Sequence, residues 1–302
     1  MTIDSADAIT SVPRTFVVPL DGSDFASRAI PIAAELCDRM HAGLVLATVS
    51  TRLDVDTRTV RPRWLDDAAR GVRSAAVEVA VVDTDDPAAG VVGLLRDRGD
   101  AGLVMATHGR GVLGTAALGG VAQEIVRVAG IPVLLVGRAC DDHLGWCGPV
   151  LVCHDGSDSA ATALAPGRAW AAALGVPIEA VHVFHPLDVS IAEASAAAID
   201  ATRAVLGPDV RSHVLRSYRP EDAIHDIAEE VGASLVAMST HGRTGLGRVA
   251  LGSVATAVVR ASLCPVLVNR PPLLTAHGTS APPTRNHGAG APVPGVASSS
   301  TG

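Results

Sequence analysis

Lysine is absent from this 302-residue chain, because all 24 basic residues are arginine. The absence excludes several kinds of chemistry. A Walker A phosphate loop requires the lysine of its Gly-Lys-Ser/Thr motif, and catalysis through a lysine Schiff base requires the side-chain amine. The phosphate-accepting site of response-regulator receiver domains also uses a lysine. The sequence therefore excludes these three classes.

Aromatic residues, positive charge and long apolar runs are also scarce. Three Trp, three Phe and one Tyr, with a net charge of −7, disfavour nucleic acid as a partner. No uninterrupted apolar run approaches the ~18 residues that would span a bilayer, and the N-terminus has no basic start or apolar segment typical of a signal peptide. We therefore expect a cytoplasmic protein with no membrane partner. The five cysteines lack CxxC spacing, so we expect packing thiols and no metal site.

One long segment occurs twice in the chain. Residues 105–122 read MATHGRGVLGTAALGGVA and residues 238–255 read MSTHGRTGLGRVALGSVA, identical at 12 of 18 positions with an offset of 133. The flanks repeat as DGSD at 21–24 and 155–158, and as PVLLV at 132–136 and PVLVN at 265–269. This offset exceeds the 20–50 residues of solenoid repeats, so the chain contains two copies of one whole domain.

Apolar runs alternate with helical patterns in both copies, which predicts an α/β fold with a parallel sheet covered on both faces. Asp86 before Pro87 predicts a capped helix over 87–98, and Pro220 opens another over 220–231. The predicted strands are 15–20, 43–49, 76–82, 102–106 and 132–136 in the first copy, and 149–153, 177–183, 210–216, 234–238 and 265–269 in the second.

These patterns divide the chain into two domains and a tail. The first domain covers 13–138 and the second 148–270, joined by a short linker. Residues 271–302 contain six prolines, many small residues and almost no bulky apolar side chain. Such a composition cannot bury enough surface to fold, so we expect a disordered tail.

The duplicated segment has the pattern of an anion-binding loop. An apolar strand is followed by Thr-His-Gly-Arg, a glycine-containing loop, and Leu-Gly-Gly or Leu-Gly-Ser at the start of a helix. Backbone N–H groups at a helix N-terminus hold anions in this setting, and glycines at 109, 119, 242 and 252 permit positive φ and close approach to a ligand. Asp21 and Asp155 follow the first strand of each copy, at the same edge of the sheet, where a carboxylate can accept a hydrogen bond from a ribose or an adenine.

Each of these features also has a purely structural interpretation. Glycine-rich loops are often only turns, and Ser253 fits the N-cap of the helix that follows it. Asp21 and Asp155 precede Gly-Ser and fit caps of the next helix equally well. His108 and His241 more often satisfy a local backbone hydrogen bond than catalyse a reaction. The repetition of all these features at one spacing favours the ligand.

In these motifs the chain resembles the universal stress protein family in its tandem, two-domain form. The nucleotide motif of that family is Gly, two residues, Gly, nine residues, Gly-Ser/Thr. Gly242 and Gly252-Ser253 match it in the second copy, and Gly109 and Gly119 match it in the first. The departures are Ser239 and Ala106 at the first glycine and Gly120 at the Ser/Thr position. The resemblance covers roughly residues 13 to 270.

The resemblance implies two doubly wound domains, each a five-stranded parallel sheet in the order 3-2-1-4-5 with helices on both faces. It implies ATP as the ligand, with or without magnesium, and pairing of the two domains through their last strands as an internal pseudo-dimer; a homodimer of the chain stays open. The implied nucleotide contacts are Asp155, Val183, Gly242, Gly252 and Ser253 in the second domain, and Asp21, Val49, Gly109 and Gly119 in the first.

The resemblance also implies a stress-response sensor or regulator that binds an adenine nucleotide and is not a metabolic enzyme. No set of nucleophile, base and acid stands out around the duplicated loop, although slow ATP hydrolysis is not excluded. A ligand-free interaction module is the other alternative. AMP or cyclic AMP also fits the pattern as a ligand. Because Gly120 offers no hydroxyl group, we expect the second domain to bind a nucleotide more tightly than the first.

Overall fold

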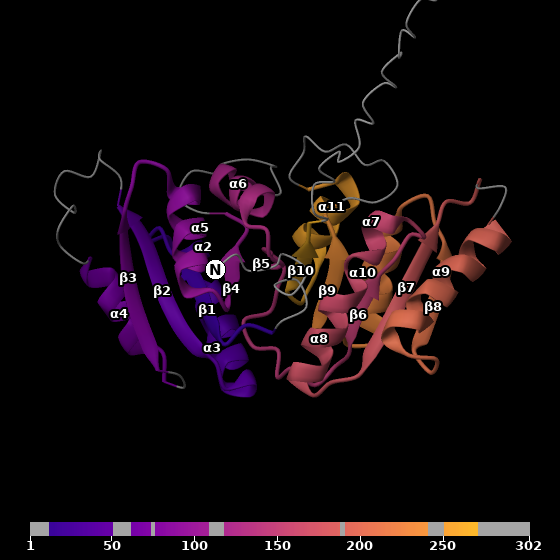
Figure 1. Cartoon of the computed structure of the whole chain (residues 1–302), viewed down its shortest axis with the longest axis horizontal. Helices are drawn as coiled ribbons and strands as arrows, with labels where there is room; N and C mark the ends of the chain where they lie inside the picture. The colour runs from indigo at the N-terminus through magenta and orange to yellow at the C-terminus, as the bar shows by residue number, and fades with distance from the viewer. Residues whose placement is uncertain are drawn as a thin grey trace, which may run out of the picture. The chain divides into compact units, whose positions relative to one another are not determined.

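The computed structural model describes residues 12–50, 62–73, 76–108, 118–187, 191–240 and 251–270. These residues form one ten-stranded sheet in the order β3-β2-β1-β4-β5-β10-β9-β6-β7-β8 (Figure 1). The strands are β1 Thr15–Pro19, β2 Gly43–Ser50, β3 Val77–Asp83, β4 Ala101–Ala106, β5 Val133–Val136, β6 Val150–Cys153, β7 Ile178–Phe184, β8 Arg211–Arg216, β9 Leu235–Ser239 and β10 Val266–Asn269. The predicted tail at 271–302 lies outside the described residues.

Each domain contributes five parallel strands, in the order 3-2-1-4-5 counted along its own sequence. Val17 of β1, for example, pairs with Val45 of β2 on one side and with Leu103 of β4 on the other. The expected fold class, order and strand positions are therefore confirmed, with each strand end within about one residue of its prediction.

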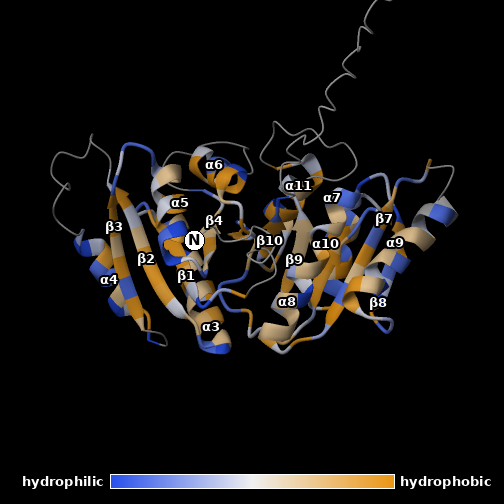
Figure 2. Cartoon of the chain, in the orientation of Figure 1, coloured by the Kyte–Doolittle hydropathy of each residue, from blue (hydrophilic) through white to orange (hydrophobic). Residues whose placement is uncertain are grey.

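The helices cover both faces of the sheet, because alternate strand residues point to opposite sides. On one face, Phe16 and Val18 belong to the apolar cluster that includes residues of α3 and α8. On the other face, Val17 belongs to the cluster that includes residues of α5, α6, α10 and α11. The strands are mostly apolar, whereas polar residues gather on the helices and loops (Figure 2). The helices are α2 Asp24–Ser27, α3 Ala29–Met40, α4 Arg63–Gly71, α5 Pro87–Arg98, α6 Gly120–Val128, α7 Asp158–Ala161, α8 Leu164–Leu174, α9 Ile191–Leu206, α10 Pro220–Glu230 and α11 Ser253–Ala261.

Local sequence explains where the predicted helices begin. α5 starts at Pro87, and the carboxylate of Asp86 accepts the backbone N–H groups of Ala88 and Ala89, both at 3.0 Å. α10 starts at Pro220, and its buried residues are Ala223, Ile224 and Ile227. In none of the described segments is a helix both long and apolar enough to cross a membrane.

The two domains meet at β5 and β10, the one antiparallel pair among the described strands, where Leu134 lies opposite Leu267. Close backbone contact accompanies this junction. A Cβ atom added to Gly137, directly after β5, would lie 2.0 Å from the carbonyl oxygen of Val259 in α11. Only glycine therefore allows the chain to leave β5 along this path.

The linker between the domains is packed against the first domain. Trp146 and Cys140 are almost fully buried. The guanidinium of Arg28 donates to the carbonyl oxygens of Arg138 (2.8 Å) and Cys140 (2.5 Å) and forms an ion pair with Asp142 (3.0 Å). Three contacts from one side chain thus hold the linker in a fixed path.

Candidate nucleotide-binding sites

A tight turn follows the first strand of each domain and fixes its aspartate. In the second domain Asp155 Oδ1 accepts the backbone N–H of Ser157 (3.0 Å) and its hydroxyl (2.6 Å). The glycine between them, Gly156, has φ +84°, in the left-handed region that glycine adopts most readily. In the first domain Asp21 Oδ1 accepts the same two groups from Ser23, at 2.9 and 2.6 Å.

The serines of these turns, and not the aspartates, cap the helices that follow. The hydroxyl oxygen of Ser23 accepts the N–H of Ala26 at 3.2 Å, and that of Ser157 accepts the N–H of Ala160 at 3.1 Å. The interpretation of Asp21 and Asp155 as helix caps is therefore wrong. Each carboxylate orients the capping serine instead, and lies partly exposed at the carboxyl edge of the sheet.

The helices that end the duplicated segment begin without a side-chain cap. Their N-cap residues are Gly119 for α6 and Gly252 for α11. The helical hydrogen bonds of α11 begin with the N–H of Thr256, which donates to the carbonyl of Gly252 at 2.9 Å. Because glycine has no side-chain acceptor, the N–H groups of the first turn remain available to an anion.

The structure corrects two expectations here. Ser253 is the first residue of α11 and not its N-cap. Gly119 and Gly252 have φ of −68° and −66°, values open to any residue, so positive φ is not the reason for glycine at these positions. Gly109, Gly242 and His241 lie outside the described residues.

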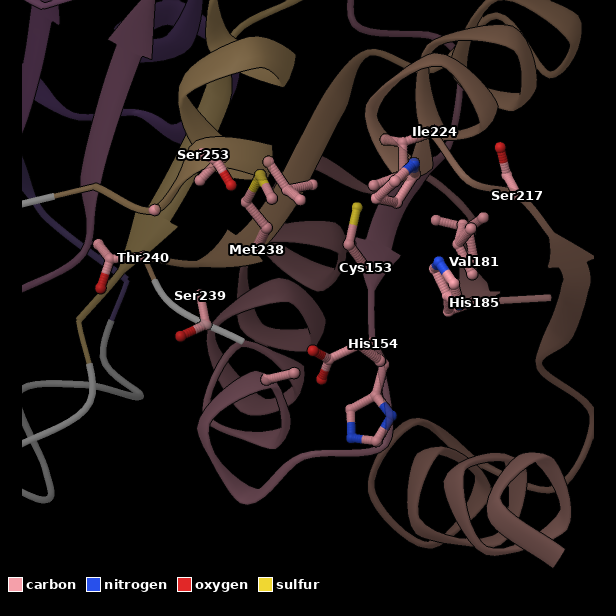
Figure 3. Close-up of a pocket in the computed structure, with 17 residues that line it drawn as sticks. Cys153, His154, Val181, His185, Ser217, Ile224, Met238, Ser239, Thr240 and Ser253 are labelled. Carbon is pink, nitrogen blue, oxygen red and sulfur yellow. The ribbon is translucent and has the colours of Figure 1, made fainter. Parts of the chain in front are cut away.

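A cavity of about 280 Å³ in the second domain brings these elements together. We call it the second cavity; Asp155, Val183, Gly252 and Ser253 all line it (Figure 3). Cys153, Val181 and Met238 face the same space from neighbouring strands, whereas the ring of His154 is turned away from Met238. The other residues of its lining are His154, Ala160, His185, Ser217, Pro220, Ile224, Ser239, Thr240, Val254 and Ala255.

The first domain contains a matching cavity of about 520 Å³, which we call the first cavity. Asp21, Val49 and Gly119 line it, so the structure also groups the described candidate residues of this domain. The remaining lining consists of Pro19, Leu20, Ala26, Pro87, Val91, Met105, Ala106, Thr107, His108, Gly120, Val121 and Ala122. Most of these positions correspond to residues of the second cavity at an offset of 133 or 134.

The two cavities differ in the polar groups that they offer. Ser253 at the start of α11 corresponds to Gly120 at the start of α6, and Ser239 corresponds to Ala106. Both serines line the second cavity. At these two positions the second cavity therefore offers hydroxyl groups that the first does not have.

Sequence reasoning missed three pairs of lining residues that come from strand ends and crossover helices. They are Met105 and Met238, Pro87 and Pro220, and Val91 and Ile224. The methionines begin the duplicated segment, which is a signal that could have identified them. The helix residues reach the cavity only because α5 and α10 pack against the sheet there, which no local motif records.

A buried thiol also lines the second cavity. Burial raises the pKa of the Cys153 thiol above its usual range, and the nearby Cys264 contributes in the same direction. A thiol that remains protonated is a poor nucleophile, so Cys153 is a packing residue of the cavity wall. Across the part of the chain that the structure describes, no group of three or more His, Cys, Asp or Glu residues is placed to hold a metal ion.

Two buried histidines lie close together at β6 and β7: His154 directly follows β6 and contributes to the lining of the second cavity, and His182 belongs to β7 but does not line the cavity. The rings of His154 and His182 are 5.7 Å apart between centroids, and both side chains are almost fully buried. Nε2 of His154 and both ring nitrogens of His182 have no hydrogen-bond partner of good geometry among the described residues. Burial, together with the neighbouring His154, lowers the pKa of His182 to about 4; burial also lowers the pKa of His154, opposed by Asp155.

The model of the Universal stress protein family matches residues 13–137 and again residues 148–270. The chain belongs to the universal stress protein family. A universal stress protein of Mycobacterium tuberculosis is 34% identical over 184 residues, which cover 56% of this chain and 61% of that relative. One of Mycolicibacterium smegmatis is 31% identical over 187 residues, again 56% of this chain and 61% of the relative. The match thus spans about 61% of the length of these relatives.

Solved structures agree on the fold. A universal stress protein from Archaeoglobus fulgidus superposes with a TM-score of 0.59 at 20% identity, covering 85% of this chain and 98% of that one. A protein of unknown function from Pseudomonas aeruginosa gives a TM-score of 0.61 at 20% identity, covering 86% and 93%. A universal stress protein solved in complex with cAMP is 26% identical over 42% of this chain and 98% of its own, with a TM-score of 0.34.

Proposed function

We propose that this universal stress protein binds an adenine nucleotide, ATP, at the carboxyl edge of each domain and acts as a stress-response sensor or regulator, not as a metabolic enzyme. The observation that supports this proposal most directly is the repeated cavity. In both domains one cavity is lined by an uncapped helix N-terminus, a fixed aspartate and a strand valine.

The three kinds of group suit the three parts of a nucleotide. The first-turn N–H groups of α11, with the hydroxyl of Ser253, suit the phosphates. The carboxylate of Asp155 suits a ribose hydroxyl or an adenine amine, and Val183 with Ile224 supplies apolar contact for the base. If magnesium is required, it binds together with the nucleotide, because Mg²⁺ in nucleotide sites is coordinated largely by the phosphates.

We assign the proposed contacts to binding and orienting the ligand, which is the task of a sensor or regulator, and we assign to none of them the role of a base for an attacking water molecule. We therefore propose that turnover of ATP, if it occurs, is slow and incidental. A ligand-free interaction module is the competing function.

Direct measurement of bound nucleotide tests the proposal. Purified full-length protein is denatured, the released small molecules are identified by mass spectrometry, and binding of added ATP is measured by calorimetry. We expect an adenine nucleotide in the released fraction or saturable binding of ATP. The absence of both would favour the ligand-free module; AMP or cyclic AMP in place of ATP would revise the ligand and retain the site.

Exchanging the residues at the two equivalent positions, Ser253 and Gly120, tests whether the serine hydroxyl makes the second site bind more tightly. Ser253→Gly should weaken ATP binding in the second domain about ten- to hundredfold, because a hydrogen bond to a charged group is worth about 1.5–3 kcal/mol. Gly120→Ser should strengthen the first site, since a Cβ atom added at Gly120 meets nothing within 4 Å. Calorimetry of both variants measures this; an unchanged affinity in Ser253→Gly would remove the hydroxyl from the phosphate contacts.

A further inference from the structure

An exposed pair of aromatic rings, His185 and Tyr218, includes one residue that lines the second cavity. His185 lines the cavity directly, as does Ser217, the residue before Tyr218. The rings of His185 and Tyr218 meet edge to face, with centroids 5.1 Å apart and an interplanar angle of 87°. We call these two residues the ring pair.

The strand ladder and local turns hold the ring pair in place. Phe184 and Arg216 pair at the ends of β7 and β8, and beyond them the N–H of Ser217 donates to the carbonyl of Phe184 at 3.1 Å. The N–H of Leu187 donates to Nδ1 of His185 at 3.3 Å. In a neutral His185 ring the proton is therefore on Nε2. Both rings thus project from a fixed backbone at the carboxyl edge of the sheet.

The exposure of Tyr218 is unusual within this chain. It is the one tyrosine of the sequence, and 65% of its surface is exposed. By contrast Phe16, Phe184, Trp146 and Trp170 are buried in the core. A rigid aromatic ring held open beside a cavity offers a stacking surface to a planar ligand.

The first domain repeats the turn but not the rings. Ser217 corresponds to Thr84, and each hydroxyl accepts the N–H two residues later: Arg219 to Ser217 at 3.0 Å, and Asp86 to Thr84 at 3.3 Å. The residue that corresponds to Tyr218 is Asp85. At one and the same backbone position the second domain therefore presents an aromatic ring and the first a carboxylate.

We propose that the ring pair packs against the base of the bound nucleotide and makes the second cavity selective for purine nucleotides over ligands that carry phosphate without an aromatic base. This inference rests on the proposed function, because it assigns the base of that ligand to His185 and Tyr218. A carboxylate at the corresponding position gives the first cavity no such preference. The two sites of one chain then differ in ligand selectivity as well as in affinity.

Calorimetry of the full-length protein with two probes, ATP and inorganic tripolyphosphate, tests the inference. The variants carry Gly119→Asp in addition, to block the first cavity. Tyr218→Ala should weaken ATP binding about five- to hundredfold, the range for loss of one stacked base, and should leave tripolyphosphate binding unchanged. Tyr218→Phe, which restores the ring, should recover most of the loss. Asp85→Ala is the matched control and should change neither probe.

The outcomes separate the ring pair from the nucleotide site itself. Wild-type affinity for ATP in Tyr218→Ala overturns the inference and leaves the proposed function intact. The same holds if the parent protein binds tripolyphosphate as tightly as ATP, because the base then contributes nothing. If the parent binds neither probe, the proposed function fails and the inference fails with it. Circular dichroism of each variant checks that a loss of binding is not a loss of fold.

Discussion

Gly252→Asp should abolish nucleotide binding in the second domain and leave the protein at least as stable as the wild type. The backbone of Gly252 has φ −66° and ψ 166°, which an aspartate adopts without strain. Aspartate is among the preferred N-cap residues, because its carboxylate accepts the N–H groups of the second and third helical residues. In α11 these residues are Val254 and Ala255.

The same carboxylate takes the place that we propose for the phosphates and repels them. Loss of two hydrogen bonds to a charged group, at about 1.5–3 kcal/mol each, corresponds to a fall in ATP affinity of more than a hundredfold. The free energy of unfolding should stay level or rise by a few tenths of a kcal/mol. Calorimetry and chemical denaturation measure the two effects.

Gly119→Asp is the matched control for this variant, since it makes the equivalent change at the start of α6. It should block the first cavity and leave ATP binding in the second at its wild-type affinity. If Gly252→Asp bound ATP as well as the wild type, the helix N-terminus would not be the phosphate site. The combination of intact stability and lost binding distinguishes a blocked site from a damaged fold.

The second domain should lose stability as the pH falls from about 6.5 to about 4. The ordinary pKa of histidine is about 6.5, and burial lowers that of His182 to about 4. Between these values the unfolded chain binds a proton that the folded chain does not, so the free energy of unfolding decreases with decreasing pH. Above pH 6.5 both states are neutral at this site and its contribution is constant.

The expected loss is large for one side chain. A pKa lowered from 6.5 to about 4 corresponds to roughly 3 kcal/mol of unfolding free energy by pH 4. The lowered pKa of the adjacent His154 acts in the same direction. Urea denaturation at a series of pH values between 7.5 and 4.5 measures the loss.

The first domain supplies the replacements that test this pH dependence. At the positions of His154 and His182 it carries Leu20 and Thr48, both buried. The double variant His154→Leu, His182→Thr should remove most of the acid loss. His143→Gln, at a side chain that is 81% exposed, should leave it in place. An equal acid loss in wild type and double variant would assign the effect to other groups.

The sequence predicted the sheet well because its strands are short apolar runs separated by turn residues. β3 at Val77–Asp83 and β8 at Arg211–Arg216 were found although they are edge strands with polar residues. The repeat made this possible, since each weak pattern occurs twice. The strands next to which β3 and β8 lie were predicted from the family resemblance, because local periodicity carries no information on strand order.

The candidate sites were predicted less completely. The residues at strand ends, such as Asp21 and Asp155, follow from the rule that ligands lie beyond the carboxyl ends of parallel strands. The capping role of Ser157 and the N-cap position of Gly252 depend on the residue at which each helix starts. Sequence patterns do not define a helix start to within one residue. The ring pair depends on two loops that meet only in the folded domain.

The antiparallel contact of β5 with β10 changes how this protein responds to dilution. Two separate domains that associate through their last strands dissociate as their concentration falls. Here the linker that Arg28 holds in place ties the two strands together, so their effective concentration is on the order of millimolar whatever the amount of protein in the cell. Pairing of the two cavities is thereby independent of the concentration of the protein, so the paired form persists at any dilution of the folded chain.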